Sequence, residues 1–112
     1  MAAHYELKAA AHEQFMFNLK AANGEVILTS ELYKTKEAAL NGIESVKTNS
    51  PHDEQFERKE STSGKPYFVL KARNHETIGK SEMYNSTGAR DNGIESVKKN
   101  APAADVDDQT AN

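Results

Sequence analysis

The segment Asn41-Gly42-Ile43-Glu44-Ser45-Val46-Lys47 recurs unchanged from Asn92 to Lys98, 51 residues later. Around it, residues 5–51 align with residues 56–102 without a gap, and 22 of the 47 aligned positions are identical. Chance does not produce such agreement at one fixed offset. The chain is therefore one sequence module written twice, and the duplication governs the architecture.

Two copies are too few for a solenoid, and a unit of about 50 residues buries too little surface to be stable alone. We therefore expect the halves, residues 1–51 and 52–102, to form one intertwined domain around a pseudo-twofold axis. Because the second copy already supplies a mate for the first, we expect a monomer with pseudo-dimeric symmetry. The acidic tail, residues 103–112, is expected to be mostly disordered, with a short strand near Val106.

Apolar and polar residues alternate from 15 to 21, which predicts a strand, and Asn23-Gly24 then predicts a hairpin turn. A two-residue loop would place Ile27 on the outward face of the sheet. A three-residue loop, with the glycine in the left-handed conformation, would place Ile27 beside Leu19 in the core. We favour the second loop because this isoleucine recurs as Ile78.

The segment that precedes this hairpin carries conflicting signals. Residues 5–14 contain three consecutive alanines and favour a helix by propensity. Residues 5–8 nevertheless align with 56–59, which resemble a strand before a turn. We predict strands at both places, because tertiary context overrides propensity in short elements.

Each copy continues into a helix. Thr35 and Ser86 are predicted N-caps. The asparagines that precede Pro51 and Pro102 by two residues, Asn49 and Asn100, suit left-handed C-caps. A glycine in the middle of each helix, Gly42 and Gly93, costs about 1 kcal/mol of helix propensity. We attribute these glycines to close packing of the helix on the sheet or on its twin.

Bulk composition excludes several classes of function. Residues 1–102 carry 14 basic and 14 acidic side chains, so the net charge of −3 resides in Asp105, Asp107 and Asp108. A neutral body offers no broad field for nucleic acid or an anionic membrane, and neither is an expected partner. Cysteine is absent, the four histidines lack metal-binding spacing, and no apolar run is long enough to span a bilayer. We expect a cytoplasmic protein without cofactor or metal.

The repeated motifs Phe17-x-Leu-Lys-Ala-x-Asn-Gly24, Ser30-Glu-x-Tyr33 and Asn41–Lys47 resemble those of the YegP-like family of small bacterial tandem-repeat domains. The resemblance covers nearly the whole chain. It implies an α+β fold in which two β(3)-α-β units build a single sheet packed by two helices, with the C-terminal strands exchanged between units. It implies no catalytic or binding residues. The chain departs from the family at residues 9–13, where members usually have a polar, glycine-containing turn.

Function is the least determined property of this sequence. Glu31-x-Tyr33 and Glu82-x-Tyr84 place an acid near a phenol, although a half-buried tyrosine at the sheet edge explains the pattern without chemistry. The repeated polar positions have a structural explanation, hydrogen bonding and recent duplication, and a functional one, a pair of equivalent recognition surfaces. The candidate recognition residues are Tyr33, Asn41, Glu44, Lys47, Tyr84, Asn92, Glu95 and Lys98.

We expect a non-enzymatic binding or protein-interaction module whose partner is an unidentified protein or small molecule. The alternative is a weak nucleic-acid-binding domain, in which lysines of the sheet would contact phosphates. An enzyme comes third, because no nucleophile elbow, phosphate loop or dinucleotide fingerprint is present.

Overall fold

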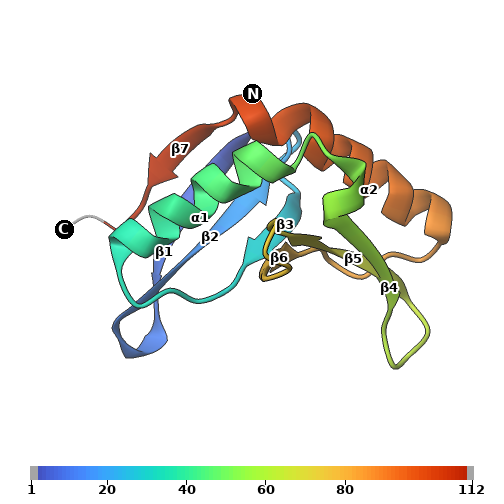
Figure 1. The fold of residues 1–112 in the computed structure, drawn as a ribbon, viewed down its shortest axis with the longest axis horizontal. Coiled ribbons are helices and arrows are strands. Elements are labelled where there is room, and N and C mark those ends of the chain that lie inside the picture. Colours follow the sequence, from blue (N-terminus) through green and yellow to red (C-terminus); the bar gives the residue numbers. More distant parts are fainter. Residues whose placement is uncertain (1–2, 111–112) are drawn as a thin grey trace.

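A computed structural model describes residues 3–110 and has one seven-stranded mixed sheet with two helices packed against it (Figure 1). Single-turn 3-10 segments lie at Ala11–Glu13, Asp53–Gln55 and Ala101–Ala103. The sheet order is β4-β5-β6-β3-β2-β1-β7. In chain order, the strands and helices are β1 (His4–Ala10), β2 (Gln14–Lys20), β3 (Val26–Ser30), α1 (Lys36–Asn49), β4 (Phe56–Glu60), β5 (Pro66–Lys71), β6 (Thr77–Lys80), α2 (Thr87–Asn100) and β7 (Asp105–Asp108).

The predicted pseudo-twofold single sheet is confirmed. The antiparallel trio β1-β2-β3 and its equivalent β4-β5-β6 meet where β3 pairs with β6, Ser30 lying opposite Gly79. The exchange of C-terminal strands is confirmed as well. The strand that follows α2, β7, lies parallel to β1 at the opposite end of the sheet, with Val106 beside Tyr5. The strand that follows α1, β4, likewise does not return to the strands before α1 and pairs instead with β5 of the second repeat.

The tail is more ordered than its composition predicted. Residues 105–108 form β7 around Val106, and the backbone N–H of Gln109 donates to the carbonyl oxygen of Leu7 over 2.8 Å. Asp108 also forms an ion pair with Lys36 of α1. An acidic segment that has no core of its own is ordered because it satisfies the backbone groups of an open strand edge. The expected disorder at 111–112 falls outside the described residues.

Both leading segments are strands, as predicted, although β1 extends to Ala10 and occupies the region where the sequence departs from the family. The turn that follows places His12 and Glu13 at φ of 61° and 59°. In the next hairpin, the N–H of Ala21 donates to the carbonyl oxygen of Glu25 over 2.8 Å, and Gly24 has φ of 86°. The loop therefore has three residues, as favoured from the sequence.

The sequence did not predict the β-bulge that follows this loop. Leu19 lies opposite Leu28 and Lys20 lies opposite Val26, so that Ile27 is the extra residue. Both Ile27 and Leu28 are buried. The second hairpin repeats the bulge at the equivalent position, Ile78. A bulge allows two consecutive side chains to enter the core, which strict alternation forbids.

The helix starts were predicted correctly, whereas the helix ends were not. The N–H of Ala38 donates to Thr35 Oγ1 over 3.0 Å, and Ser86 caps α2 in the same way. Asn49, however, stays helical, and Ser50 after it has φ of −62°. The Asn49 side chain donates to the carbonyl oxygen of Ser45 over 2.8 Å, and Asn100 repeats this bond with Ser96. Because the amide satisfies that carbonyl directly, no left-handed residue is needed.

One hydrophobic core lies between the sheet and the helices and draws on both repeats. Its largest fully buried side chains are the aromatic rings of Tyr5, Phe17 and Phe68. Among residues 3–110, no helix has the length and apolar character needed to cross a lipid bilayer.

Candidate functional site

A tyrosine that follows the third strand of each repeat lies over the glycine of the helix. Tyr33 is held by two backbone hydrogen bonds with Phe15, of 2.7 and 2.8 Å, and its ring stacks on Phe17 with a centroid separation of 6.2 Å. A Cβ atom at Gly42 would lie 2.8 Å from Cζ of this ring. The mid-helix glycine is thus explained by contact with a tyrosine of the same repeat.

The second repeat builds the same arrangement. The Tyr84 ring stacks on Phe68 with a centroid separation of 6.3 Å, and a Cβ atom at Gly93 would lie 2.8 Å from Cζ of Tyr84. A buried serine fixes the segment before each tyrosine. Ser30 Oγ accepts from the N–H of Phe17 and donates to the carbonyl oxygen of Glu31, and Ser81 makes the equivalent pair of bonds.

Each tyrosine borders an open cavity between its own helix and the hairpin of the other repeat. We name these cavities the Tyr33 site and the Tyr84 site. The Tyr33 site has a volume of about 240 Å³ and is lined by Glu31, Tyr33, Ala38, Asn41, Gly42 and Ser45 of repeat one and Ala72, Glu76, Thr77 and Ile78 of repeat two. The Tyr84 site has a volume of about 290 Å³ and is lined by Ala21, Asn23, Glu25, Ile27, Tyr84, Ala89, Asn92, Gly93 and Ser96.

The lining of the two sites coincides with the sequence that the two repeats share. All nine residues of the Tyr84 site are identical in the other repeat, and in the Tyr33 site only Thr77, which corresponds to Val26, is not. Over the whole alignment, 25 of the 47 positions differ. The cavities therefore lie where the copies have diverged least.

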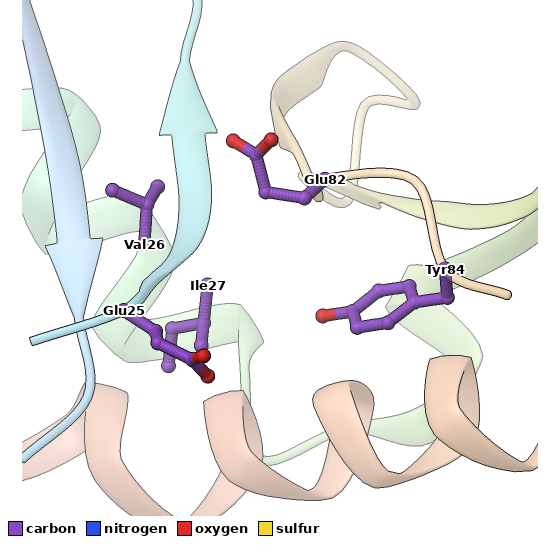
Figure 2. Close-up of a pocket in the computed structure, with 5 residues that line it drawn as sticks. All are labelled: Glu25, Val26, Ile27, Glu82 and Tyr84. Atoms are coloured by element: carbon purple, nitrogen blue, oxygen red, sulfur yellow. The ribbon is translucent and has the colours of Figure 1, made fainter. Parts of the chain in front are cut away.

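A second depression of about 470 Å³ enlarges the Tyr84 site and adds Glu82 and Val26 to its lining. In Figure 2 the Tyr84 hydroxyl points across this space toward Ile27 and Glu25, and the Glu82 side chain extends from the same segment as the tyrosine. We include these two residues in the Tyr84 site. Glu82 corresponds to Glu31 of the Tyr33 site.

Each site thus combines one phenol with two carboxylates, one from each repeat. Burial raises the pKa of Tyr33, and the charges of Glu31 and Glu76 raise it further. Burial, Glu82 and Glu25 do the same to the pKa of Tyr84. Both phenols therefore stay protonated at neutral pH and present an O–H donor.

The carboxylates of the two sites have no cationic partner within the described part of the chain, whereas other repeated acids do. Glu6 lies 3.1 Å from Lys20 Nζ, and its equivalent, Glu57, lies 2.7 Å from Lys71 Nζ. No Lys, Arg or His of residues 3–110 pairs with the acids of the two sites, which are Glu25, Glu31, Glu76 and Glu82. Each site therefore carries uncompensated negative charge beside an apolar wall that includes Ile27 or Ile78.

The eight candidate residues from the sequence separate into two groups. Tyr33 and Asn41 line one site, and Tyr84 and Asn92 line the other. The remaining four lie elsewhere on the helices, outside both linings. Lys47 lies over the Tyr5 ring, 5.8 Å from its centroid. Burial raises the pKa of Tyr5, and the charge of Glu44 raises it further.

The equivalent helix residues of the second repeat form an ion-pair group. Lys98 Nζ lies 2.7 Å from Asp53 and 3.2 Å from Glu95. Sequence reasoning did not include the hairpin carboxylates Glu25 and Glu76. The two glutamates occupy equivalent positions and are identical in the two repeats, which could have marked them as candidates. Nothing in the sequence of one repeat, however, indicates that its hairpin faces the helix of the other repeat.

One cluster in the described chain has ligand types that suit a metal ion. The ligand atoms of His4, Glu6 and Asp107 lie within 4.8 Å of one another, on β1 and β7. Glu6, however, is already compensated by Lys8 and Lys20, which lie 3.4 and 3.1 Å away. A cation would have to displace these amines, so the cluster is a poor metal site.

The comparisons agree with the repeat and with the fold. A family model described as a domain of unknown function, DUF1508, matches residues 10–57 and again residues 61–108. The chain belongs to this family, in two tandem copies. The two DUF1508 matches are 51 residues apart, as the repeats are, but each begins later than the boundaries we assigned and ends in the strand that follows its helix. The second match therefore includes all of β7, and the first includes the beginning of β4.

Relatives of this DUF1508 protein align over nearly its whole length. It is 54% identical to a UPF0339 protein of Shewanella oneidensis, over 98% of this chain and 100% of the relative. It is also 54% identical to the UPF0339 protein YegP of Yersinia pestis, over 96% of each chain. Its fold is similar to the solution structure of YegP from E. coli, with a TM-score of 0.93 and 50% identity over 100% of this chain and 97% of that one.

Proposed function

We propose that this protein is a non-enzymatic binding module, acting as a cytoplasmic monomer, whose two equivalent sites each receive a lysine or arginine side chain of a partner protein. The observation that carries the proposal is that the residues lining the two sites are identical between the copies except at Val26 and Thr77, although the copies differ at more than half of their positions. Structural need explains the glycine and the tyrosine ring. It does not explain four glutamates that form no ion pair with any Lys, Arg or His of residues 3–110.

The chemistry of the lining selects a cation. Two carboxylates supply charge-assisted acceptors, and a phenol and an amide, Tyr33 and Asn41 in the first site, supply further polar contacts. The apolar wall suits the aliphatic part of a long basic side chain. The raised pKa of each phenol keeps it protonated at neutral pH, so it is not poised to abstract a proton, and its oxygen can still accept a hydrogen bond from the cation; both points support binding rather than catalysis.

The same features disfavour the nucleic-acid alternative, since carboxylates repel phosphates. Of the sheet residues that would have to stack on bases or contact them, Asn18 and Val69 are buried.

An NMR titration with N-acetyl-arginine amide tests the proposal, with the neutral isostere N-acetyl-citrulline amide as a matched control. We expect saturable shifts in the backbone amides of both sites with the arginine compound alone. Equal shifts with citrulline, or shifts confined to other surfaces, would refute the proposal.

The duplication provides an internal control. Glu31→Gln combined with Glu76→Gln neutralises the Tyr33 site and leaves the Tyr84 site intact. Because a hydrogen bond to a charged group contributes roughly 1.5–3 kcal/mol, arginine affinity should fall at least about tenfold at the altered site alone. An equal fall at both sites would indicate a general electrostatic effect.

A further inference from the structure

The two ends of the sheet differ. At one end, β7 covers the outer edge of β1. The pseudo-twofold relates β1 to β4, and at the other end of the sheet no strand of residues 3–110 lies beyond β4 (Figure 1). The equivalent strands β1 and β4 therefore differ in one respect: the outer edge of β1 is covered by β7, and the outer edge of β4 is open in the described structure.

The open edge presents unpaired backbone groups at positions defined by the ladder. Phe68 of β5 uses its backbone groups on the side away from β4: its N–H donates to Ser81 Oγ, and its carbonyl oxygen accepts from the N–H of Ser81. Arg58 lies opposite Phe68 on β4, so these two residues form a pair without backbone hydrogen bonds between them. The N–H and C=O of Arg58 therefore point outward, as do those of Phe56 and Glu60. The equivalent residue on β1, Leu7, uses its outward carbonyl to accept from Gln109 of the covering segment.

The side chains of β4 differ from those of β1 in a way that fits an exposed edge. Leu7 is fully buried, whereas its equivalent, Arg58, is exposed and lies 3.2 Å from Asp91 and 3.3 Å from Asp53. Lys59 beside it forms no direct ion pair in the described structure, although, after the hydrogen bond from Lys71, its charge helps to lower the pKa of Glu57. Charged edge residues prevent indiscriminate pairing of sheets and still permit a strand of complementary charge.

We propose that the open edge of β4 binds an extended acidic segment of another protein as an added parallel strand, in the register that β7 adopts on β1. In that register, the residue in the place of Val106 lies beside Phe56. The residues in the places of Asp108 and Gln109 lie beside Arg58 and Lys59. A fitting segment has an apolar residue followed, two and three positions later, by acidic ones.

The covered twin edge supports this occupant, because β7 is itself acidic and pairs with the equivalent strand. The copy of β7 in this chain is engaged at β1 and does not reach β4. The edge shares no residue with the Tyr33 and Tyr84 sites, so this proposal stands independently of them.

The test is an NMR titration of the full chain with a synthetic peptide of residues 103–110, whose sequence already fits the equivalent edge. We expect saturable shifts in the amides of Phe56, Arg58 and Glu60. Shifts at Tyr5 and Leu7 instead would show that the peptide only displaces β7, and would overturn the proposal. Shifts of the β4 amides on dilution of the protein alone would assign the edge to a second copy, and would also overturn it.

Matched peptides establish the pairing without altering the protein. N-methylation at Gln109, whose N–H donates to β1 in this structure, should abolish the β4 shifts, whereas N-methylation at Asp108, whose N–H points away, should spare them. With a peptide in which Gln109→Glu places a carboxylate beside Lys59, the Lys59→Glu variant should bind roughly fivefold more weakly than the wild type, as expected for an exposed charge pair. Equal binding of both methylated peptides would contradict strand addition.

Discussion

The hydroxyl of Tyr5 donates a 2.8 Å hydrogen bond to the carbonyl oxygen of Ala101, which lies 96 positions later in the chain. The bond joins the first strand to the turn after the last helix, and both groups are buried. Tyr5→Phe removes the donor and leaves this carbonyl unsatisfied. We expect the free energy of unfolding to fall by about 1 kcal/mol, measurable by urea denaturation. An unchanged midpoint would show that the bond contributes nothing.

The other half of the molecule inverts this arrangement. Phe56 takes the place of Tyr5, and Ser50 takes that of Ala101. The Oγ of Ser50 is fully buried and has no hydrogen-bond partner among residues 3–110. Ser50→Ala removes an unsatisfied hydroxyl, and we expect it to raise the free energy of unfolding by up to about 1 kcal/mol. A fall in thermal midpoint would contradict the prediction and would indicate that the hydroxyl packs well or holds a water.

The helix glycines give a prediction opposite to propensity. Alanine is the better helix former, yet at Gly42 or Gly93 its Cβ meets a tyrosine ring stacked on the core. We expect each Gly→Ala change to cost about 2 kcal/mol, as overpacking does. Gly88→Ala, where the nearest atom is 3.9 Å away, should stabilise by up to about 1 kcal/mol. Calorimetry of the three variants checks this, and stabilisation by all three would refute the explanation.

Glu6 sets a pH dependence of stability. A hydrogen bond with His4, followed by contacts with Lys20 and Lys8, lowers its pKa from 4.5 to about 2. Because the folded-state pKa is depressed, the stabilisation is complete above about pH 4.5 and is lost as the pH falls toward 2. Glu6→Gln should be less stable than the wild type at pH 7 and should lose less stability between pH 5 and 2. Parallel acid titration curves for the two proteins would rule out this role.

The features that could be predicted from the sequence were those marked by a local pattern or by agreement between the two repeats. The pairing of the halves, the strands at residues 5–8 and 56–59, the N-caps and the loop at Gly24 all followed from local pattern or from agreement between copies. The tail did not, because its acidic composition favours disorder and its order depends on the edge of β1 at the other end of the chain. The bulge at Ile27 and the C-terminal ends of the helices depended on contacts that periodicity does not encode.

The candidate site was predictable to the same extent. Tyr33 and Asn41, with their equivalents, were recognised because each motif is repeated within one helix-bearing segment. The hairpin acids Glu25 and Glu76 were missed because each belongs to the opposite repeat. Only the crossing of helix over hairpin brings the two sets together.

The position of β7 also constrains how the protein is made. Strand β1 is synthesised before its neighbours β7 and Ala101, and Ala101 follows Tyr5 by 96 positions. The first repeat therefore waits, with one edge of its sheet unpaired, until those later residues have left the ribosome. In that interval the exposed edge of β1 is most open to pairing with another nascent chain.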